Sequence, residues 1–268
     1  MKRMSFPLYQ IDAFASRVFA GNPAAVVVMD GWLDDKLLQA IGAENNLSET
    51  AFVIPDGEVC PLRWFTPTLE IDLCGHATLA TAHVLFRHYL GQLDRISFAT
   101  KSGRLTVTRN GPILSMDFPS RPGRSIEVDD TLVSALGCKP KEALLSRDLL
   151  AVFESEADVR GFQPDPQRIA SIDAFGLIIS APGTDVDFVM RFFAPGAGVL
   201  EDPVTGSAQC TLIPYWANRL GKCTLTARQL STRGGEVYCE SRDDRVIIGG
   251  TAVEYLRGEI SLDVEAAS

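Results

Sequence analysis

One short pattern occurs twice in the sequence, and this repeat constrains the fold more than any other feature. The first copy is Arg63-Trp64-Phe65-Thr66-Pro67, and the second is Arg191-Phe192-Phe193-Ala194-Pro195, 128 positions later in a chain of 268 residues. Each copy runs into a turn of small residues and then a long apolar segment. A repeat of about half the chain length predicts two similar lobes that face each other across one site.

The two copies differ in the turn after the shared pattern. The first continues as Leu73-Cys74-Gly75-His76-Ala77-Thr78, and the second as Glu201-Asp202-Pro203-Val204-Thr205-Gly206-Ser207-Ala208. Cys74 and Asp202 lie at the same distance from their arginines, and three extra residues separate Asp202 from the second helix. Taken singly, each motif is a tight glycine turn, with Ser207 as an N-cap. Because both copies open a helix, whose first N–H groups are unpaired and partly positive, we predict a shared carboxylate site.

Hydrophobic periodicity predicts an α+β fold in which each lobe is rich in strands and contains one buried helix. Residues 77–90 are apolar on nearly every face, which is typical of a buried helix, and we expect Gly91 to cap it. Residues 208–220, followed by Gly221, form the second copy. A shorter helix is expected from Asp34 to residues 44–46. Strands are expected at residues 8–13, 24–29, 50–54, 62–65, 104–108, 114–118, 175–180 and 186–193, with 246–250 and 258–262 as a terminal β pair.

A polar stretch at residues 120–130 is the best candidate for a linker between the lobes. It predicts a first lobe at residues 1–118 and a second at residues 119–268. The last few C-terminal residues could return to the first lobe.

Composition excludes several classes of function. The chain has 46% hydrophobic and 22% charged residues, as in soluble globular proteins. A net charge of −9 argues against a nucleic-acid surface, although it leaves room for a small anionic substrate. The six cysteines form no C-x-x-C motif and no metal-like pairing with histidine, so no metal site is expected. There is no signal-peptide core and no run of eighteen apolar residues, so we expect no membrane contact and a cytoplasmic protein.

Glu44 and Glu49 are the two candidates for a proton-transferring carboxylate in the first lobe. Glu44 lies at a helix end, where the dipole disfavours a negative charge, and burial there would make it a proton carrier near neutral pH. Glutamates are more often exposed, and the residues alone do not separate Glu44 from Glu49. In the second lobe, Asp202 is the candidate acid or base, or it orients His76; the simpler interpretation is an Asx turn before Pro203.

Cys74 could also take part in proton transfer. A helix N-terminus lowers the pKa of a thiol, which would let Cys74 abstract a proton, but a small buried residue in a packed turn explains it equally well. The remaining histidines, His83 and His88, are interpreted as packing or surface residues.

Five motifs are spread along most of the chain, from residue 11 to about residue 220. They are Asp12-Ala13-Phe14 with Gly21-Asn22-Pro23-Ala24-Ala25-Val26, then Glu44 with Asn46-Leu47-Ser48-Glu49-Thr50, Arg63-x-Phe65-Thr66-Pro67, residues 74–78 and residues 201–208. In this order, the five motifs together resemble the PhzF-like, or phenazine-biosynthesis-like, family.

The resemblance implies the diaminopimelate-epimerase-like fold, in which each of two related lobes wraps a curved mixed sheet around a central helix, with the site in the cleft between. It also implies cofactor-free isomerase chemistry and often a homodimer. By position, Glu44 matches the glutamate that shuttles a proton between carbons in the phenazine enzyme. The polar partners of that glutamate are matched by His76, Asp202 and Ser207, and its backbone donors by Gly75 and Gly206.

Two departures from the family pattern concern the substrate. The phenazine enzyme has no cysteine at the position of Cys74, whereas the amino-acid epimerases use one there. Asp202 takes the place of the second cysteine of those epimerases. The chain thus has one half of a thiol pair and one half of a carboxylate pair.

We therefore expect a cofactor-independent isomerase that moves a proton on a small carboxylate-bearing metabolite. The expected catalytic residues are Glu44, Asp202 and His76, and the expected substrate-binding residues are Gly75, Gly206, Ser207 and Cys74. The alternatives are an amino-acid epimerase or racemase that uses Cys74 as a base, and a non-catalytic binding protein on the same scaffold.

Overall fold

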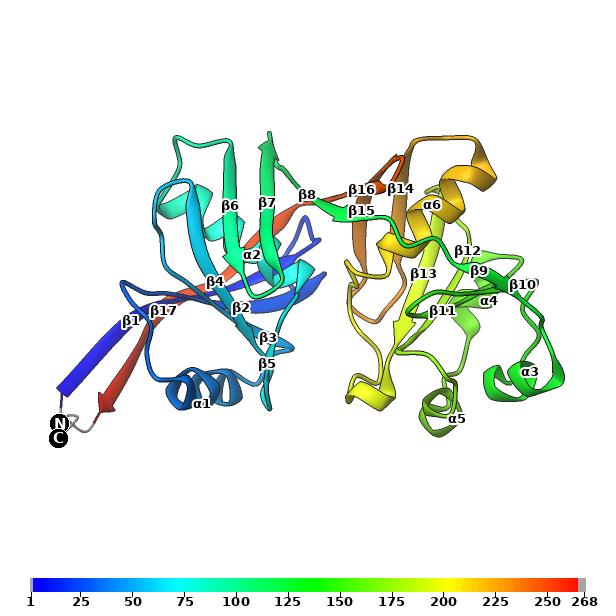
Figure 1. Ribbon diagram of the computed structural model, residues 1–268, viewed down its shortest axis with the longest axis horizontal. Coiled ribbons are helices and arrows are strands. Elements are labelled where there is room, and N and C mark those ends of the chain that lie inside the picture. The colour runs from blue at the N-terminus through cyan, green and yellow to red at the C-terminus, as the bar shows by residue number, and fades with distance from the viewer. Residues whose placement is uncertain (1, 265–268) are drawn as a thin grey trace. The chain divides into compact units, whose positions relative to one another are not determined.

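A computed structural model describes residues 2–264 of the chain. The chain divides into two compact units (Figure 1). The first contains the residues up to Met116 together with those from Gly250 onward, and the second is Asp117–Gly249. The boundary lies close to the predicted one at residue 118. The return to the first unit, however, involves a whole strand and not only the last few residues, so the predicted second lobe at 119–268 is too long.

The first unit is a mixed sheet with two helices. Starting from the last strand of the chain, each strand lies beside the next in the order β17, β1, β2, β3, β4, β6, β7 and β8. Its elements are β1 (Lys2–Ala13), β2 (Asn22–Val28), α1 (Asp35–Asn45), β3 (Glu49–Val53), β4 (Val59–Phe65), β5 (Glu70–Ile71), α2 (Gly75–His88), β6 (Arg95–Thr100), β7 (Gly103–Asn110), β8 (Ile113–Pro119) and β17 (Ala252–Val264).

The second unit is a mixed sheet whose strands follow one another in simple chain order, from β9 to β16. Its elements are β9 (Arg124–Ile126), α3 (Asp130–Leu136), β10 (Glu142–Leu145), β11 (Leu149–Val152), α4 (Glu156–Gly161), α5 (Pro166–Ala170), β12 (Leu177–Pro182), β13 (Phe188–Phe193), the 3₁₀ turn η1 (Pro195–Ala197), α6 (Gln209–Leu220), β14 (Thr224–Gln229), β15 (Gly235–Arg242) and β16 (Arg245–Gly250).

Strand directions show that the two units are copies of one fold. From β17 to β8, successive pairs are antiparallel, antiparallel, parallel, antiparallel, parallel, antiparallel and antiparallel. The second sheet has the same succession from β9 to β16. The long helix α2 lies in the chain between β4 and β6, the fifth and sixth strands of the first order, and α6 lies between β13 and β14, the fifth and sixth strands of the second. The prediction of two similar α+β lobes is confirmed.

Helix α2 packs against β1, β2, β3 and β17 of its own unit, as expected for a helix that is apolar on all faces. Two threonines in its first two turns, Thr78 and Thr81, donate their hydroxyls to helix carbonyls one turn earlier, so these buried polar groups are satisfied locally. Its fully buried apolar side chains are Ala77, Leu79, Ala80, Ala82, Val84 and Leu85. No helix within residues 2–264 combines the length and the apolar character needed to cross a membrane.

Three local predictions are wrong. Helix α2 ends before Gly91, because the Leu90 N–H already bonds to the Leu85 carbonyl and closes the helix; Gly221, by contrast, caps α6 in the left-handed conformation as predicted. The predicted linker contains β9, which pairs with β10. The predicted terminal pair does not form, since β17 pairs with β1 along its whole length.

The arginine of the repeated pattern makes the same ion pair in both units. Arg63 Nε and Nη2 donate to the two carboxylate oxygens of Glu70 at 2.7 and 2.8 Å. Arg191 Nε and Nη2 donate to those of Glu201 at 2.7 and 3.1 Å. Each guanidinium also stacks on the phenylalanine two positions further on, at 5.1 and 5.0 Å. The repeat thus ties a strand to the turn that precedes the long helix.

Replacing Arg191 by Met should lower the free energy of unfolding by about 3 kcal/mol, because it leaves the half-buried Glu201 carboxylate without its cation. It also removes the donor to the carbonyls of Val159 and Phe162. The matched control is Arg219→Met in the same unit, where an exposed ion pair with Glu142 is lost at a cost below about 1 kcal/mol. Urea titration of the two variants measures the difference, and equal losses would contradict the structural role of the repeat.

Candidate active site

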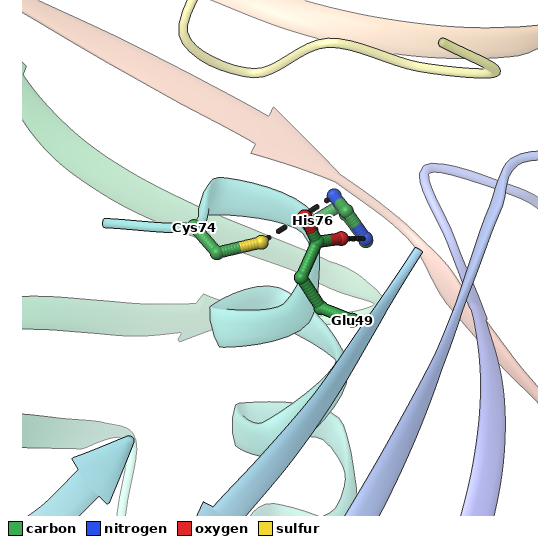
Figure 2. A group of neighbouring side chains, drawn as sticks. All are labelled: Glu49, Cys74 and His76. Atoms are coloured by element: carbon green, nitrogen blue, oxygen red, sulfur yellow. Dashed lines mark hydrogen bonds and ion pairs between the residues drawn. The ribbon is translucent and has the colours of Figure 1, made fainter. Parts of the chain in front are cut away.

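Three functional side chains meet at the start of α2 in the first unit (Figure 2). His76 Nε2 lies 2.9 Å from Glu49 Oε2, and His76 Nδ1 lies 3.6 Å from Cys74 Sγ and 3.3 Å from Asn22 Nδ2. The contact between His76 and Glu49 is an ion pair without hydrogen-bond geometry. Among residues 2–264, neither Glu49 Oε2 nor His76 Nε2 has a hydrogen-bond partner, although both atoms are buried.

Local backbone geometry brings these residues together. Asn46 adopts the left-handed conformation with φ 48° and ends α1, which reverses the chain so that β3 begins at Glu49. Cys74 is the N-cap residue of α2 in an extended conformation, with φ −144°, and its side chain makes no capping hydrogen bond. The thiol is therefore available to His76, the second residue of the helix.

Burial and neighbouring charge set the protonation of the cluster. Burial disfavours a charged imidazole, but Cys74 and Glu49 together outweigh it and raise the pKa of His76 well above its ordinary value of 6.5. Burial, and then the charge of Glu49, raises the pKa of the Cys74 thiol above 9.0. The prediction that the helix start lowers the pKa of Cys74 is wrong, because desolvation is the larger effect. A thiolate at Cys74 and an imidazolium at His76 would each favour the charged form of the other.

The structure separates the two glutamates between which the residues alone could not decide. Glu44 is exposed on the last turn of α1, so the burial that would have made it a proton carrier is not present. Only 15% of the Glu49 side chain is exposed, and its carboxylate contacts His76. The geometry of the first unit therefore gives no support to Glu44 and brings Glu49 to the cluster.

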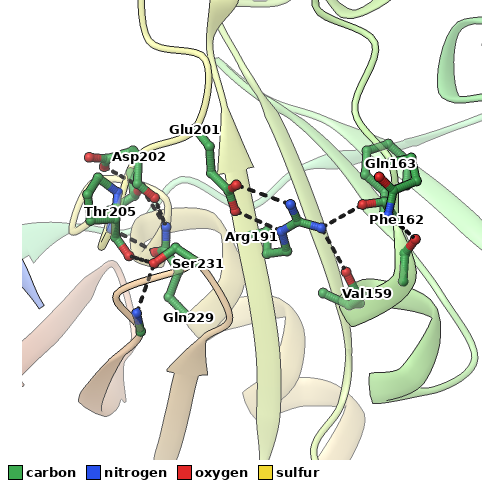
Figure 3. A network of polar contacts seen from close by, with 12 residues as sticks. Val159, Phe162, Gln163, Arg191, Glu201, Asp202, Thr205, Gln229 and Ser231 are labelled. Carbon is green, nitrogen blue, oxygen red and sulfur yellow. Dashed lines mark hydrogen bonds and ion pairs between the residues drawn. The ribbon is translucent and has the colours of Figure 1, made fainter. Parts of the chain in front are cut away.

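The candidate residues of the second unit lie in the turn before α6 (Figure 3). The Thr205 hydroxyl donates to Asp202 Oδ2 at 2.5 Å. Gln229, the last residue of β14, accepts a hydrogen bond from the Thr205 N–H at 2.8 Å and donates to the Asp202 carbonyl at 2.6 Å. Asp202 is thus held by Thr205 and Gln229, two residues that the sequence did not single out.

Gly206 and Ser207 lie in a tight turn that leads into α6, which itself begins at Gln209. The Ser207 hydroxyl accepts a hydrogen bond from Arg147 Nη2 at 3.2 Å. Arg147 is oriented by two hydrogen bonds to the buried Asp148 and stacks on Phe175. Burial raises the pKa of Asp148, while Arg147 opposes that shift. Ser207 is therefore not the N-cap of α6, and a cation lies beside its hydroxyl.

Strand pairing changes which residues of the two copies correspond. In the first unit, Ile71 pairs with Trp64, one position after Arg63. In the second, the Asp202 N–H bonds to the carbonyl of Phe192, one position after Arg191. Asp202 therefore occupies the place of Ile71, and the three extra residues precede Glu201, in the turn that contains η1.

If positions are counted forward from the glutamate of each ion pair, Glu70 or Glu201, then Cys74 corresponds to Thr205 and His76 to Ser207. The predicted pairing of Cys74 with Asp202 is wrong, because equal distance along the sequence crosses the insertion. The pairing of Gly75 with Gly206 is kept.

The cluster of Glu49, Cys74 and His76 also has the spacing of a metal site, since one donor atom from each lies within 4.8 Å of the others. Metal ligands must be deprotonated, and the burial that raises the pKa of the Cys74 thiol acts against such binding. Elsewhere in the unit, His88 pairs with Glu254 at 2.6 Å and stacks on Tyr9, which confirms its interpretation as a packing residue.

The fold occurs in distant and in similar proteins of known structure. A probable proline racemase of Agrobacterium radiobacter is 10% identical and aligns over 96% of this chain and 93% of its own, with a TM-score of 0.63, which shows a shared diaminopimelate-epimerase-like fold. A PhzF-family protein of Enterococcus faecalis is 48% identical, with coverage of 96% and 99% and a TM-score of 0.94.

The sequence comparisons agree. An uncharacterized isomerase of Pseudomonas aeruginosa is 50% identical over 260 residues, which cover 97% of this chain and 100% of the relative. The family model described as phenazine biosynthesis-like protein matches residues 11–258. The chain therefore belongs to the phenazine biosynthesis-like, or PhzF, family.

Proposed function

We propose that the protein is an isomerase that moves a proton on a small carboxylate-bearing metabolite by general acid–base catalysis, without a cofactor. The observation that carries the proposal is the contact between Glu49 Oε2 and His76 Nε2. Both atoms are buried, and they face each other at 2.9 Å without hydrogen-bond geometry, which places a carboxylate directly beside an imidazole. The name of the Pseudomonas aeruginosa relative, an uncharacterized isomerase, supports the same class of reaction.

In this proposal Glu49, and not Glu44, is the proton carrier. The Glu49 carboxylate takes a proton from a substrate carbon that is next to both the carboxyl group and a C=C bond. The electron pair of the broken C–H bond shifts through this double bond to its far carbon, and the protonated Glu49 returns the proton there, so the double bond moves and the isomer is formed without net gain or loss. The positive charge of His76 stabilises the negative charge that develops on the substrate.

Backbone donors at the helix starts are proposed to bind the substrate carboxylate. In the first unit, α2 begins at Gly75 without a side-chain cap, so its first N–H groups and helix dipole favour an anion. In the second unit, we propose Gly206 and Ser207 as carboxylate-binding groups and Asp202 as a further acid–base group. The cation of Arg147 beside Ser207 suits an anionic ligand.

Cys74 is proposed to contact the substrate and to support His76, and not to act as a base. An epimerase that used Cys74 as its base would need a thiolate, and burial with the nearby charge of Glu49 raises the pKa of this thiol. The raised value argues against the epimerase alternative.

Replacing Glu49 by Gln should slow exchange of substrate C–H for deuterium by about 10²–10⁴-fold, because the amide cannot accept the proton. The assay incubates the protein with a panel of carboxylate metabolites in D₂O and follows the loss of C–H signals by proton NMR. Glu44→Gln is the matched control, since it makes the same chemical change at an exposed site, and it should leave exchange unchanged. If Glu44→Gln loses exchange and Glu49→Gln keeps it, the assignment of the carrier is reversed. Silence of the wild-type protein across the panel would favour a binding protein.

His76 should remain an imidazolium at neutral pH, and Glu49→Gln should lower its pKa because a negative neighbour is removed. Since the pKa is higher in the folded protein, protonation of His76 stabilises the fold. This stabilisation is complete below the unfolded-state pKa of about 6.5 and is lost as the pH rises through the folded-state pKa. Imidazole ¹⁵N chemical shifts followed against pH measure the titration. A neutral His76 ring in the wild-type protein at neutral pH is the contrary result.

A further inference from the structure

The turn that contains Asp202 is closed by one buried amide. Gln229 is fully buried, and both of its N–H donors and its oxygen are used within this turn. Its oxygen accepts from the Thr205 N–H at 2.8 Å, and its nitrogen donates to the Asp202 carbonyl at 2.6 Å and to Thr205 Oγ1 at 3.3 Å. If the amide were reversed, its nitrogen would face the Thr205 N–H, donor against donor, and its oxygen would face the Asp202 carbonyl, acceptor against acceptor. The partners therefore fix the orientation of the amide.

Thr205 connects this amide to the Asp202 side chain. A hydroxyl has a single hydrogen, and that of Thr205 is donated to Asp202 Oδ2, while its oxygen accepts from Gln229. The hydrogen bonds therefore point in one direction, from the Gln229 amide through the Thr205 hydroxyl to the carboxylate. Each bond in such a chain polarises the next, and a neutral donor aimed at a carboxylate makes one of the stronger hydrogen bonds in proteins.

Two further contacts hold the same turn in place. Ser231 Oγ donates to the Pro203 carbonyl at 2.7 Å, and Arg191 holds Glu201 (Figure 3). Thr205 corresponds to Cys74 of the first unit, whose side chain likewise contacts a candidate catalytic residue and does not cap the helix. In both units this position therefore supports an acid–base side chain.

We propose that Thr205 and Gln229 are positioning residues, which together hold the Asp202 carboxylate in a single orientation for the reaction. The inference rests on the proposed function in one respect, the acid–base role of Asp202. Gln229 acts through Thr205, and Thr205 acts through its hydroxyl alone. A residue at position 205 that only stabilised the turn would not need a hydroxyl group directed at the Asp202 carboxylate.

The test compares Thr205→Val, which removes the hydroxyl at nearly constant size, with Thr205→Ser, which keeps it. The first measurement needs no substrate: three-bond couplings from Asp202 Cγ to its backbone nitrogen and carbonyl carbon report the χ1 rotamer by NMR. We expect couplings of one rotamer in the wild-type protein and in Thr205→Ser, and averaged couplings in Thr205→Val. Couplings that remain unchanged in Thr205→Val overturn the inference, whatever the activity of the protein.

The second measurement is turnover in the exchange assay. Loss of orientation should lower kcat by about 10–100-fold in Thr205→Val and leave KM nearly unchanged, while Thr205→Ser should recover most of kcat. Averaged couplings with wild-type turnover overturn the proposed link to the reaction, whereas failure of the proposed function itself appears separately, as absence of exchange in the wild-type protein.

Gln229→Met tests the relay from its other end and keeps the inference falsifiable if Thr205→Val does not fold. It should also average the Asp202 couplings. Gln209→Met is the matched control, because Gln209 is equally buried in the same unit but contacts Met190 and Cys239 and not the turn. Averaged Asp202 couplings in Gln209→Met would show a general loss of order and overturn the specific role of Gln229.

Discussion

The burial of α2 on every side is the constraint on which the chemistry of the first unit depends. An unpaired polar side chain is costly on a helix that is buried by a sheet, and Thr78 and Thr81 avoid this cost by bonding to the helix backbone. Its first turn is different, because N–H groups there lack helical partners and create a positive potential. Cys74 and His76 lie at that turn, and Glu49 reaches it from the start of β3.

The second unit shows how one backbone can support different chemistry. Both copies keep the Arg–Glu ion pair and the glycine turn, but the insertion around η1 shifts the sequence by three positions. Where the first copy has the apolar Ile71, the second has Asp202, and where the first has a thiol, the second has the Thr205 hydroxyl. The two copies therefore share one backbone arrangement, and a few side chains make their helix starts chemically different.

Features that depend on local pattern could be predicted from the sequence, and features that depend on distant contacts could not. The buried helix, the repeat and the left-handed Gly221 follow from composition and periodicity over a few residues. The contact of Glu49, and not Glu44, with His76 depends on the left-handed turn at Asn46, which lies between the two glutamates. Gln229 lies 24 and 27 positions from Thr205 and Asp202 and belongs to no motif. Strand β17 pairs with β1, which lies at the opposite end of the chain.

The pairing of a carboxylate with an imidazolium explains how an acidic chain can handle an anionic substrate. Net charge acts over long distances through solvent, whereas two buried groups in contact are barely screened. In the mechanism that we propose, Glu49 and His76 together carry no net charge before reaction. When Glu49 takes a proton its own charge would be lost, and the imidazolium would be left facing the negative charge that forms on the substrate. The stabilisation therefore appears only as the C–H bond breaks, which is the condition for an interaction to accelerate the chemical step.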